Sequence, residues 1–183
     1  MWKYITLKSI QRRFARSRKT RKQRFVPYRE ASTIVVLTDG PDARQALHAL
    51  EAMVRDGKRV VWYHFTPAAQ SESPLAAPVS GIETVTLSLA DLHRGNTCPR
   101  PEILRTFEAW PADVLLDLTL DDPLPVAYLA ARSQAPMRLG LQKNALVPAD
   151  IMLQLEPEKT TVGDLLQNML FYWKNIAAKN NNS

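Results

Sequence analysis

Four polar side chains are predicted to follow buried strands, where they could carry out acid–base chemistry. They are Asp39, His64, Asp121 and Asp122. Ligands of open parallel sheets bind beyond the carboxyl ends of the strands, so a carboxylate and an imidazole in such a crevice could together move a proton. Asp39 and Asp122, however, precede Pro41 and Pro123, where helix caps belong. The sequence therefore favours capping over catalysis at these aspartates and a packed strand residue at His64.

Other chemistries lack the residues that they require. The six glycines are too far apart for a dinucleotide-binding or phosphate-binding loop, and no G-x-S-x-G nucleophile turn is present. The one cysteine, Cys98, excludes an internal disulfide and a cysteine-based zinc site. His48 and His93 have no partners at metal-ligand spacing. We therefore predict no catalytic residue, no metal and no cofactor.

Positive charge is concentrated at the N-terminus. Residues 1–24 contain ten cations and no acid, whereas residues 25–183 contain 14 cations and 18 acids, for a charge of about −4. This asymmetry predicts an anionic partner for the leading segment. The candidate anion-binding residues are Lys8, Arg12, Arg13, Arg16, Arg18, Lys19, Arg21, Lys22 and Arg24.

Three interpretations compete for this basic segment. In the first, residues 3–24 bind the phosphates of RNA or of a ribosome, which the eight cations between Arg12 and Arg24 favour. In the second, the segment lies on an anionic membrane surface with its apolar side buried in the lipid, which the apolar start of the chain favours. In the third, it is a solvated tail. The apolar side that would enter the lipid in the second interpretation consists of Trp2, Ile5, Leu7, Ile10 and Phe14.

Hydrophobic periodicity predicts the elements that position these residues. The spacing of Leu7, Ile10 and Phe14 predicts an amphipathic helix over about 3–22. Strands are predicted at 33–38, 59–65, 83–87, 113–118, 138–141 and 151–155, and helices at 42–56, 101–109, 123–133 and from 160 or 161 to 178. Strands that alternate with helices predict an α/β fold, a Rossmann-like or flavodoxin-like sandwich with a mainly parallel sheet of about 5–6 strands.

The length of 183 residues fits one domain with its own core. We expect a basic amphipathic arm at 1–26, a single α/β domain at 27–179 that folds without the arm, and a disordered tail at 180–183. No apolar run approaches the roughly 18 residues of a membrane-spanning helix. A cytoplasmic location, in association with ribosomes or membranes, is therefore expected.

The predicted last helix is more apolar than one face of a sheet requires. A core-facing stripe is formed by Val162, Leu165, Leu166, Met169, Trp173 and Ile176, and residues 170–172 widen it. Core packing alone explains the stripe. The excess apolar surface favours a homodimer through helix 161–178 as the alternative.

Two resemblances to known families add expectations. Residues 110–141 (WPADVLLDLTLDDPLPVAYLAARSQAPMRLGL) resemble a strand–helix–strand segment in the acceptor-side half of heptosyltransferase-type glycosyltransferases. Such enzymes also need a nucleotide-sugar-binding domain, so the resemblance implies a related fold or a degenerate ligand-binding domain. The basic first helix, residues 121–129 and residues 138–140 also resemble a family of small proteins of Bacteroidetes-type bacteria, which implies a bacterial, cytoplasmic setting.

The interpretation that combines these observations is a non-enzymatic adaptor that docks to RNA or the ribosome through its basic arm. A peripheral membrane protein and a glycosyltransferase-like or small-ligand-binding domain are the alternatives.

Overall fold

A computed structural model describes residues 2–67, 80–93, 97–143, 146–154 and 161–179. Its main sheet has six parallel strands in the order β3-β2-β1-β6-β7-β8. The strands are β1 (Thr33–Asp39), β2 (Arg59–Phe65), β3 (Ile82–Leu87), β6 (Val114–Asp117), β7 (Met137–Leu141) and β8 (Ile151–Leu153). Numbered as successive sheet strands, this is the 3-2-1-4-5-6 order of the Rossmann fold and not the 2-1-3-4-5 order of flavodoxin. The α/β prediction is confirmed, and the strand order decides between its two forms.

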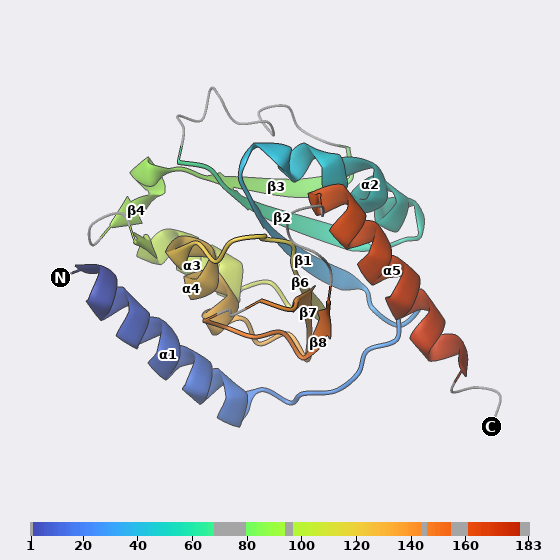
Figure 1. Ribbon diagram of the computed structural model, residues 1–183, viewed down its shortest axis with the longest axis horizontal. Coiled ribbons are helices and arrows are strands. Elements are labelled where there is room, and N and C mark those ends of the chain that lie inside the picture. The colour runs from blue at the N-terminus through green and yellow to red at the C-terminus, as the bar shows by residue number, and fades with distance from the viewer. Residues whose placement is uncertain (1, 68–79, 94–96, 144–145, 155–160, 180–183) are drawn as a thin grey trace.

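Helices cover both faces of the sheet (Figure 1). The 3₁₀ helix η1 (Pro41–Ala46), α2 (Leu47–Arg55) and α5 (Val162–Lys179) lie on one face, and α3 (Pro101–Glu108), α4 (Leu124–Arg132) and α1 (Trp2–Thr20) lie on the other. The predicted helix at 42–56 is thus two helices. Gly40, at φ 72°, precedes Pro41, and a 3₁₀ turn leads into the α-helix.

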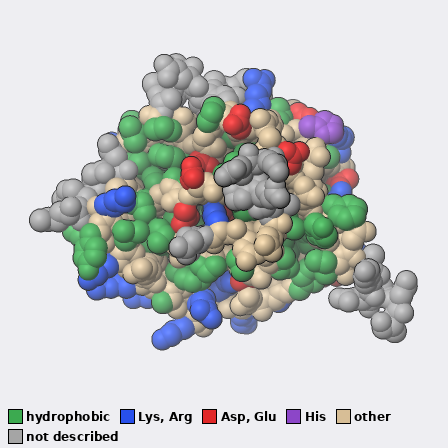
Figure 2. Space-filling model, viewed as in Figure 1, with side chains coloured by type: hydrophobic (Ala, Val, Ile, Leu, Met, Phe, Trp, Pro, Cys, Tyr) green, Lys and Arg blue, Asp and Glu red, His purple; other side chains and the backbone are tan. Residues whose placement is uncertain are grey.

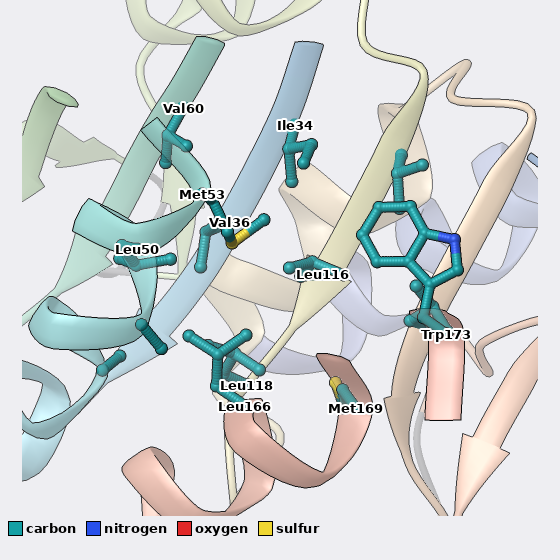
Figure 3. Packing of buried hydrophobic residues seen from close by; sticks show 14 of the residues in the cluster. Ile34, Val36, Leu50, Met53, Val60, Leu116, Leu118, Leu166, Met169 and Trp173 are labelled. Carbon is teal, nitrogen blue, oxygen red and sulfur yellow. The ribbon is translucent and has the colours of Figure 1, made fainter. Parts of the chain in front are cut away.

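The central strands are buried on both faces because they are continuous apolar runs. Side chains at even positions of β1, such as Ile34 and Val36, pack against Leu50 and Met53 of α2 and against α5 (Figure 3). Odd positions, such as Val35, pack against α3 and α4. Trp173 of α5 is fully buried, and its Nε1 donates to the backbone oxygen of Val26 at 2.7 Å. One apolar layer therefore lies on each side of the sheet.

The first helix docks on the body of the protein. Ile10 is fully buried in the layer formed with α4, and Phe14 packs against the same layer from a half-buried position. The chain then runs from the end of α1 along one edge of the sheet to β1 (Figure 1). On the way, Val26 packs into the apolar layer on the other face of the sheet from Ile10. The helix predicted over 3–22 is confirmed, and the structure shows it packed against α4. The division of the chain at residue 26 stays a prediction.

The stretch after β3 contains more structure than the sequence predicts. A 3₁₀ turn, η3 (Leu89–Asp91), is closed by a capping box between Ser88 and Asp91, and β4 (Leu92–His93) pairs antiparallel with β5 (Cys98–Pro99). Most of the loop predicted at 66–81 and the tail predicted at 180–183 lie outside the described residues. In the part of the chain that the structure describes, no helix is long and apolar enough to cross a membrane.

Candidate functional site

The carboxyl edge of the sheet gathers several charged side chains at the point where the strand order reverses. Asp39 ends β1 and Asp117 ends β6, and these two strands are neighbours that lead to opposite halves of the sheet. Lys143 follows β7 on the same edge, and its Nζ lies 3.4 Å from Oδ2 of Asp117. Parallel α/β sheets bind ligands at this switch point, so the cluster is the first candidate site.

The hydrogen bonds of Lys143 show what the cluster does. Its Nζ donates to the backbone oxygen of Thr119 at 2.7 Å, to Oγ1 of Thr119 at 2.5 Å and to the backbone oxygen of Asp121 at 2.9 Å. An ammonium group has three protons, and these three acceptors satisfy them. Lys143 therefore braces the loop between β6 and α4, and its charge is engaged within the protein.

The aspartates at this edge do not cap helices, so the capping prediction is wrong. The N-cap residues of η1 and α4 are Gly40 and Pro123, and neither helix has a side-chain cap hydrogen bond. Asp122 instead accepts a hydrogen bond from the backbone N–H of Leu146 at 2.6 Å, which ties two loops together. The position of Asp122 directly before Pro123 was a misleading signal, because the backbone N–H of Leu146, 24 residues away, binds the same carboxylate.

The environment of the aspartates raises their pKa values. Burial raises the pKa of Asp39 to about 6, and although Lys143 opposes the shift, the negative charges of Asp117 and Asp121 add to it. Burial also raises the pKa of Asp122, against the effect of its bond from Leu146 and the charge of Lys143. Burial thus disfavours the ionised forms of Asp39 and Asp122.

His64 is a fully buried residue at the end of β2. Trp62 Nε1 donates to Oγ1 of Thr38 at 2.8 Å, and Oγ1 of Thr38 shares a hydrogen bond with Nδ1 of His64 at 3.0 Å. Among the described residues, Nε2 of His64 has no hydrogen-bond partner. Burial lowers the pKa of His64 to about 4. A neutral, enclosed imidazole of this kind supports the sheet and is a poor base at neutral pH.

Among the described residues, no three histidine, cysteine, aspartate or glutamate side chains come together as metal ligands. Cys98 is buried.

The second candidate site is the outer face of α1. Because residues three and four apart share a face of a helix, Lys8, Arg12, Arg16 and Lys19 lie together, and all four are exposed. Figure 2 shows Lys and Arg side chains gathered along the lower left margin of the molecule, where Figure 1 places α1. Arg18, Lys22 and Arg24 are also exposed beside this face. Five of the predicted anion-binding cations, Lys8, Arg12, Arg16, Arg18 and Lys19, are thus exposed on a docked helix, and Lys22 and Arg24 follow its end.

Two of the predicted cations point elsewhere. Arg21 is buried, and its guanidinium binds the carboxylate of Asp150 at 2.5 and 2.6 Å and the backbone oxygen of Ala135 at 3.0 Å. Arg13 is half-buried, with its guanidinium 5.5 Å from the ring centroid of Tyr128. Arg21 therefore holds the segment to the body, while Arg13 lies in the junction between α1 and α4.

The comparisons with known proteins bear on the fold. No model of a protein family matches this chain, and no curated protein matches it. Among solved structures, a glycosyl transferase family 9 protein from Veillonella parvula DSM 2008 is similar, with a TM-score of 0.56 and 16% sequence identity over 83% of this chain. The chain spans 43% of the length of that protein. This likeness agrees with the resemblance of residues 110–141 to heptosyltransferase-type enzymes at the level of the fold.

Sequence reasoning missed two members of the switch-point cluster, Asp117 and Lys143. The rule that ligands and polar groups collect at the carboxyl ends of strands could have found both, since Asp117 ends one predicted strand and Lys143 follows another. It also missed Arg105 and Arg132, which lie near α1 in the structure. Both are single cations on separate helices, and nothing in their local sequence connects them to the basic segment.

Proposed function

We propose that this protein is an RNA-binding module that docks the phosphates of RNA, free or in a ribosome, on the outer face of α1. The observation that supports the proposal is the arrangement of Lys8, Arg12, Arg16 and Lys19 on one exposed face of a helix whose other face is packed on the body. Because the helix is already folded and docked, its cations are placed before the partner arrives, which lowers the entropy cost of binding.

The exposed aromatic side chain near the start of α1 favours RNA that is at least partly single-stranded. Tyr4 is 61% exposed, and Nζ of Lys8 lies 4.6 Å from the centroid of its ring. A hollow of about 440 Å³ along α1 is lined by Tyr4, Lys8, Arg12 and Arg16, among others. An aromatic ring next to cations can stack on an unpaired base while the cations bind the flanking phosphates.

The membrane alternative requires the apolar side of α1 to enter lipid. Ile10 is fully buried against the body, and Leu7 and Phe14 are half-buried. To insert into a bilayer, α1 would have to leave α4 and expose the apolar layer beneath it. The free-energy cost of exposing this apolar layer favours a partner that binds the outer, charged face of α1.

The salt dependence of binding tests the proposal. A fluorescently labelled, unstructured RNA of about 20 nucleotides is titrated with the full chain at several salt concentrations. Four phosphate contacts predict that log K falls with log salt with a slope of about −3 for a single strand, since each contact contributes about −0.7. The double variant Arg12→Gln/Arg16→Gln should reduce the slope by about 1.4.

The matched control is Arg44→Gln/Arg55→Gln, which removes the same charge from exposed positions on η1 and α2. It should leave the slope unchanged. If both double variants reduced the slope equally, RNA binding would depend on the net charge of the protein and not on the cations of α1. Binding of phosphatidylserine vesicles that persists at high salt and disappears in Ile5→Ala, a change on the apolar side of α1, would instead establish the membrane alternative.

A further inference from the structure

A pocket lined by arginines lies beside the outer face of α1. It has a volume of about 270 Å³ and is formed where α1, α3, α4 and the β4–β5 hairpin meet. Three arginines line it, Arg13, Arg105 and Arg132, together with His93. No aspartate or glutamate is among the described residues that line it.

The positive charge of this pocket is largely uncompensated. Arg132 forms an ion pair through Nε with Glu108, which lies outside the pocket. Among the described residues, the guanidinium of Arg13 forms no ion pair and lies over the face of the Tyr128 ring, which carries no net charge. In the described structure, the side chain of Arg105 has no hydrogen bond and no ion pair, and it is exposed at the pocket. The pocket is therefore a cationic site without an anion of its own.

A second pocket continues the site along the helix junction. It has a volume of about 180 Å³ and shares Arg13 and Arg132 with the first, and it adds Arg16 of the outer face of α1. Glu108 also lines this second pocket, and its carboxylate forms the ion pair with Nε of Arg132. Through Arg13 and Arg132, the two pockets thus connect the outer face of α1 to Arg105.

The chemistry of the lining selects the ligand. Guanidinium groups bind phosphate oxygens through paired N–H donors, which gives both strength and a defined orientation. A terminal phosphate carries a charge of about −1.5 to −2 and three acceptor oxygens, more than the single charge of a phosphate within a chain. A pocket lined by three arginines therefore suits the terminal group best.

We infer that the pocket formed by Arg13, Arg105 and Arg132 binds a phosphomonoester. Two sources supply this chemistry, the terminal phosphate of an RNA whose chain lies along α1 and a phosphorylated small molecule. The first rests on the proposed function, whereas the second does not.

The test compares two RNAs of identical sequence, one with a 5′-phosphate and one with a 5′-hydroxyl, by calorimetric titration of the full chain. Glycerol phosphate is titrated separately as a small phosphomonoester. A charge-assisted hydrogen bond to Arg105 predicts at least about tenfold tighter binding of the phosphorylated end, and Arg105→Gln should abolish the difference. Arg100→Gln is the matched control, because Arg100 is exposed at the start of the same helix and does not line the pocket.

The outcomes separate the two proposals. Preference for the 5′-phosphate that is lost in Arg105→Gln supports the RNA end as the source. Binding of glycerol phosphate that is lost in Arg105→Gln, without binding of either RNA, supports the pocket and overturns the proposed function. Equal affinity for both RNAs together with no binding of glycerol phosphate overturns the pocket, while salt-dependent RNA binding would leave the proposed function standing.

Discussion

The guanidinium of Arg21 and the carboxylate of Asp150 face each other through two hydrogen bonds, from Nη1 to Oδ2 at 2.6 Å and from Nη2 to Oδ1 at 2.5 Å. Arg21 directly follows the basic helix, and Asp150 directly precedes the edge strand β8. Arg138 of β7 lies beside them, with its backbone N–H bound to Oδ2 of Asp150 at 2.8 Å and its side chain bound to Oγ of Ser17 at 3.0 Å. This cluster fastens the end of α1 to the sheet, so the cationic face outside it keeps a fixed position.

Asp150→Ala should strongly destabilise the protein. The side chain of Arg21 is only 2% exposed, and Arg138 is buried beside it. Without the carboxylate, a buried guanidinium loses its counter-charge, which typically costs about 3–5 kcal/mol of unfolding free energy. Denaturant unfolding measures the loss, and Glu30→Ala, an exposed acid, is the control. A change below about 1 kcal/mol would mean that the pair does not hold the segment in solution.

Ile10→Ala tests whether α1 is docked. Ile10 is fully buried between α1 and the layer beneath it, so its truncation should leave a cavity that costs about 2–5 kcal/mol. Ile5→Ala is the matched control, since Ile5 lies on the same helix and is 41% exposed. Thermal or denaturant unfolding compares the two. Equal, small effects would indicate a helix that does not contribute to the folded body.

The raised pKa of Asp39 predicts a stability difference that depends on pH. An acid with a raised pKa favours the folded state in its protonated form, so this contribution is present below pH 3.8 and is lost as the pH rises through about 6. Asp39→Asn cannot ionise and should gain stability relative to the wild type across this window, by on the order of 1–3 kcal/mol.

The measurement is the unfolding free energy of both proteins between pH 4 and pH 7. Because burial lowers the pKa of His64 to about 4, protonation of that residue destabilises the fold as the pH falls from 6.5, which is the opposite sign. Both proteins contain His64, so its contribution cancels in the difference. A difference that stays constant with pH would show that Asp39 ionises normally.

The outer surface of α5 predicts self-association. Phe171, Tyr172 and Ile176 are 63%, 50% and 39% exposed, so the prediction that Ile176 faces the core is wrong. Figure 2 shows hydrophobic side chains over α5 at the right of the molecule. Aromatic side chains dominate the energy of interfaces, so Phe171→Ser/Tyr172→Ser should weaken a homodimer at least about tenfold. Sedimentation of the full chain measures the association. Gln167→Ser, an exposed position on the same helix, is the control. A wild-type chain that sediments as a monomer at high concentration contradicts the prediction.

The sequence by itself determined the number and type of the main elements. The six strands were found because each central strand is a short β-branched or apolar run, and the helices were found because Pro, Gly and the Thr161–Asp164 capping box mark their ends. These are local signals, readable from residues within one or two turns. The short β4–β5 pair was missed because two-residue strands leave no periodic pattern.

Only the tertiary structure decided the strand order, the docking of α1 and the composition of the candidate sites. Leu7, Ile10 and Phe14 show that the first helix needs an apolar surface, but a lipid and α4 satisfy that need equally well in the sequence. Arg21 and Asp150 are 129 positions apart. Arg13, Arg105 and Arg132 belong to three different helices and line one pocket only in the folded protein. Such contacts depend on how all the layers pack at once, because each one is stable only after the others have closed the chain around it.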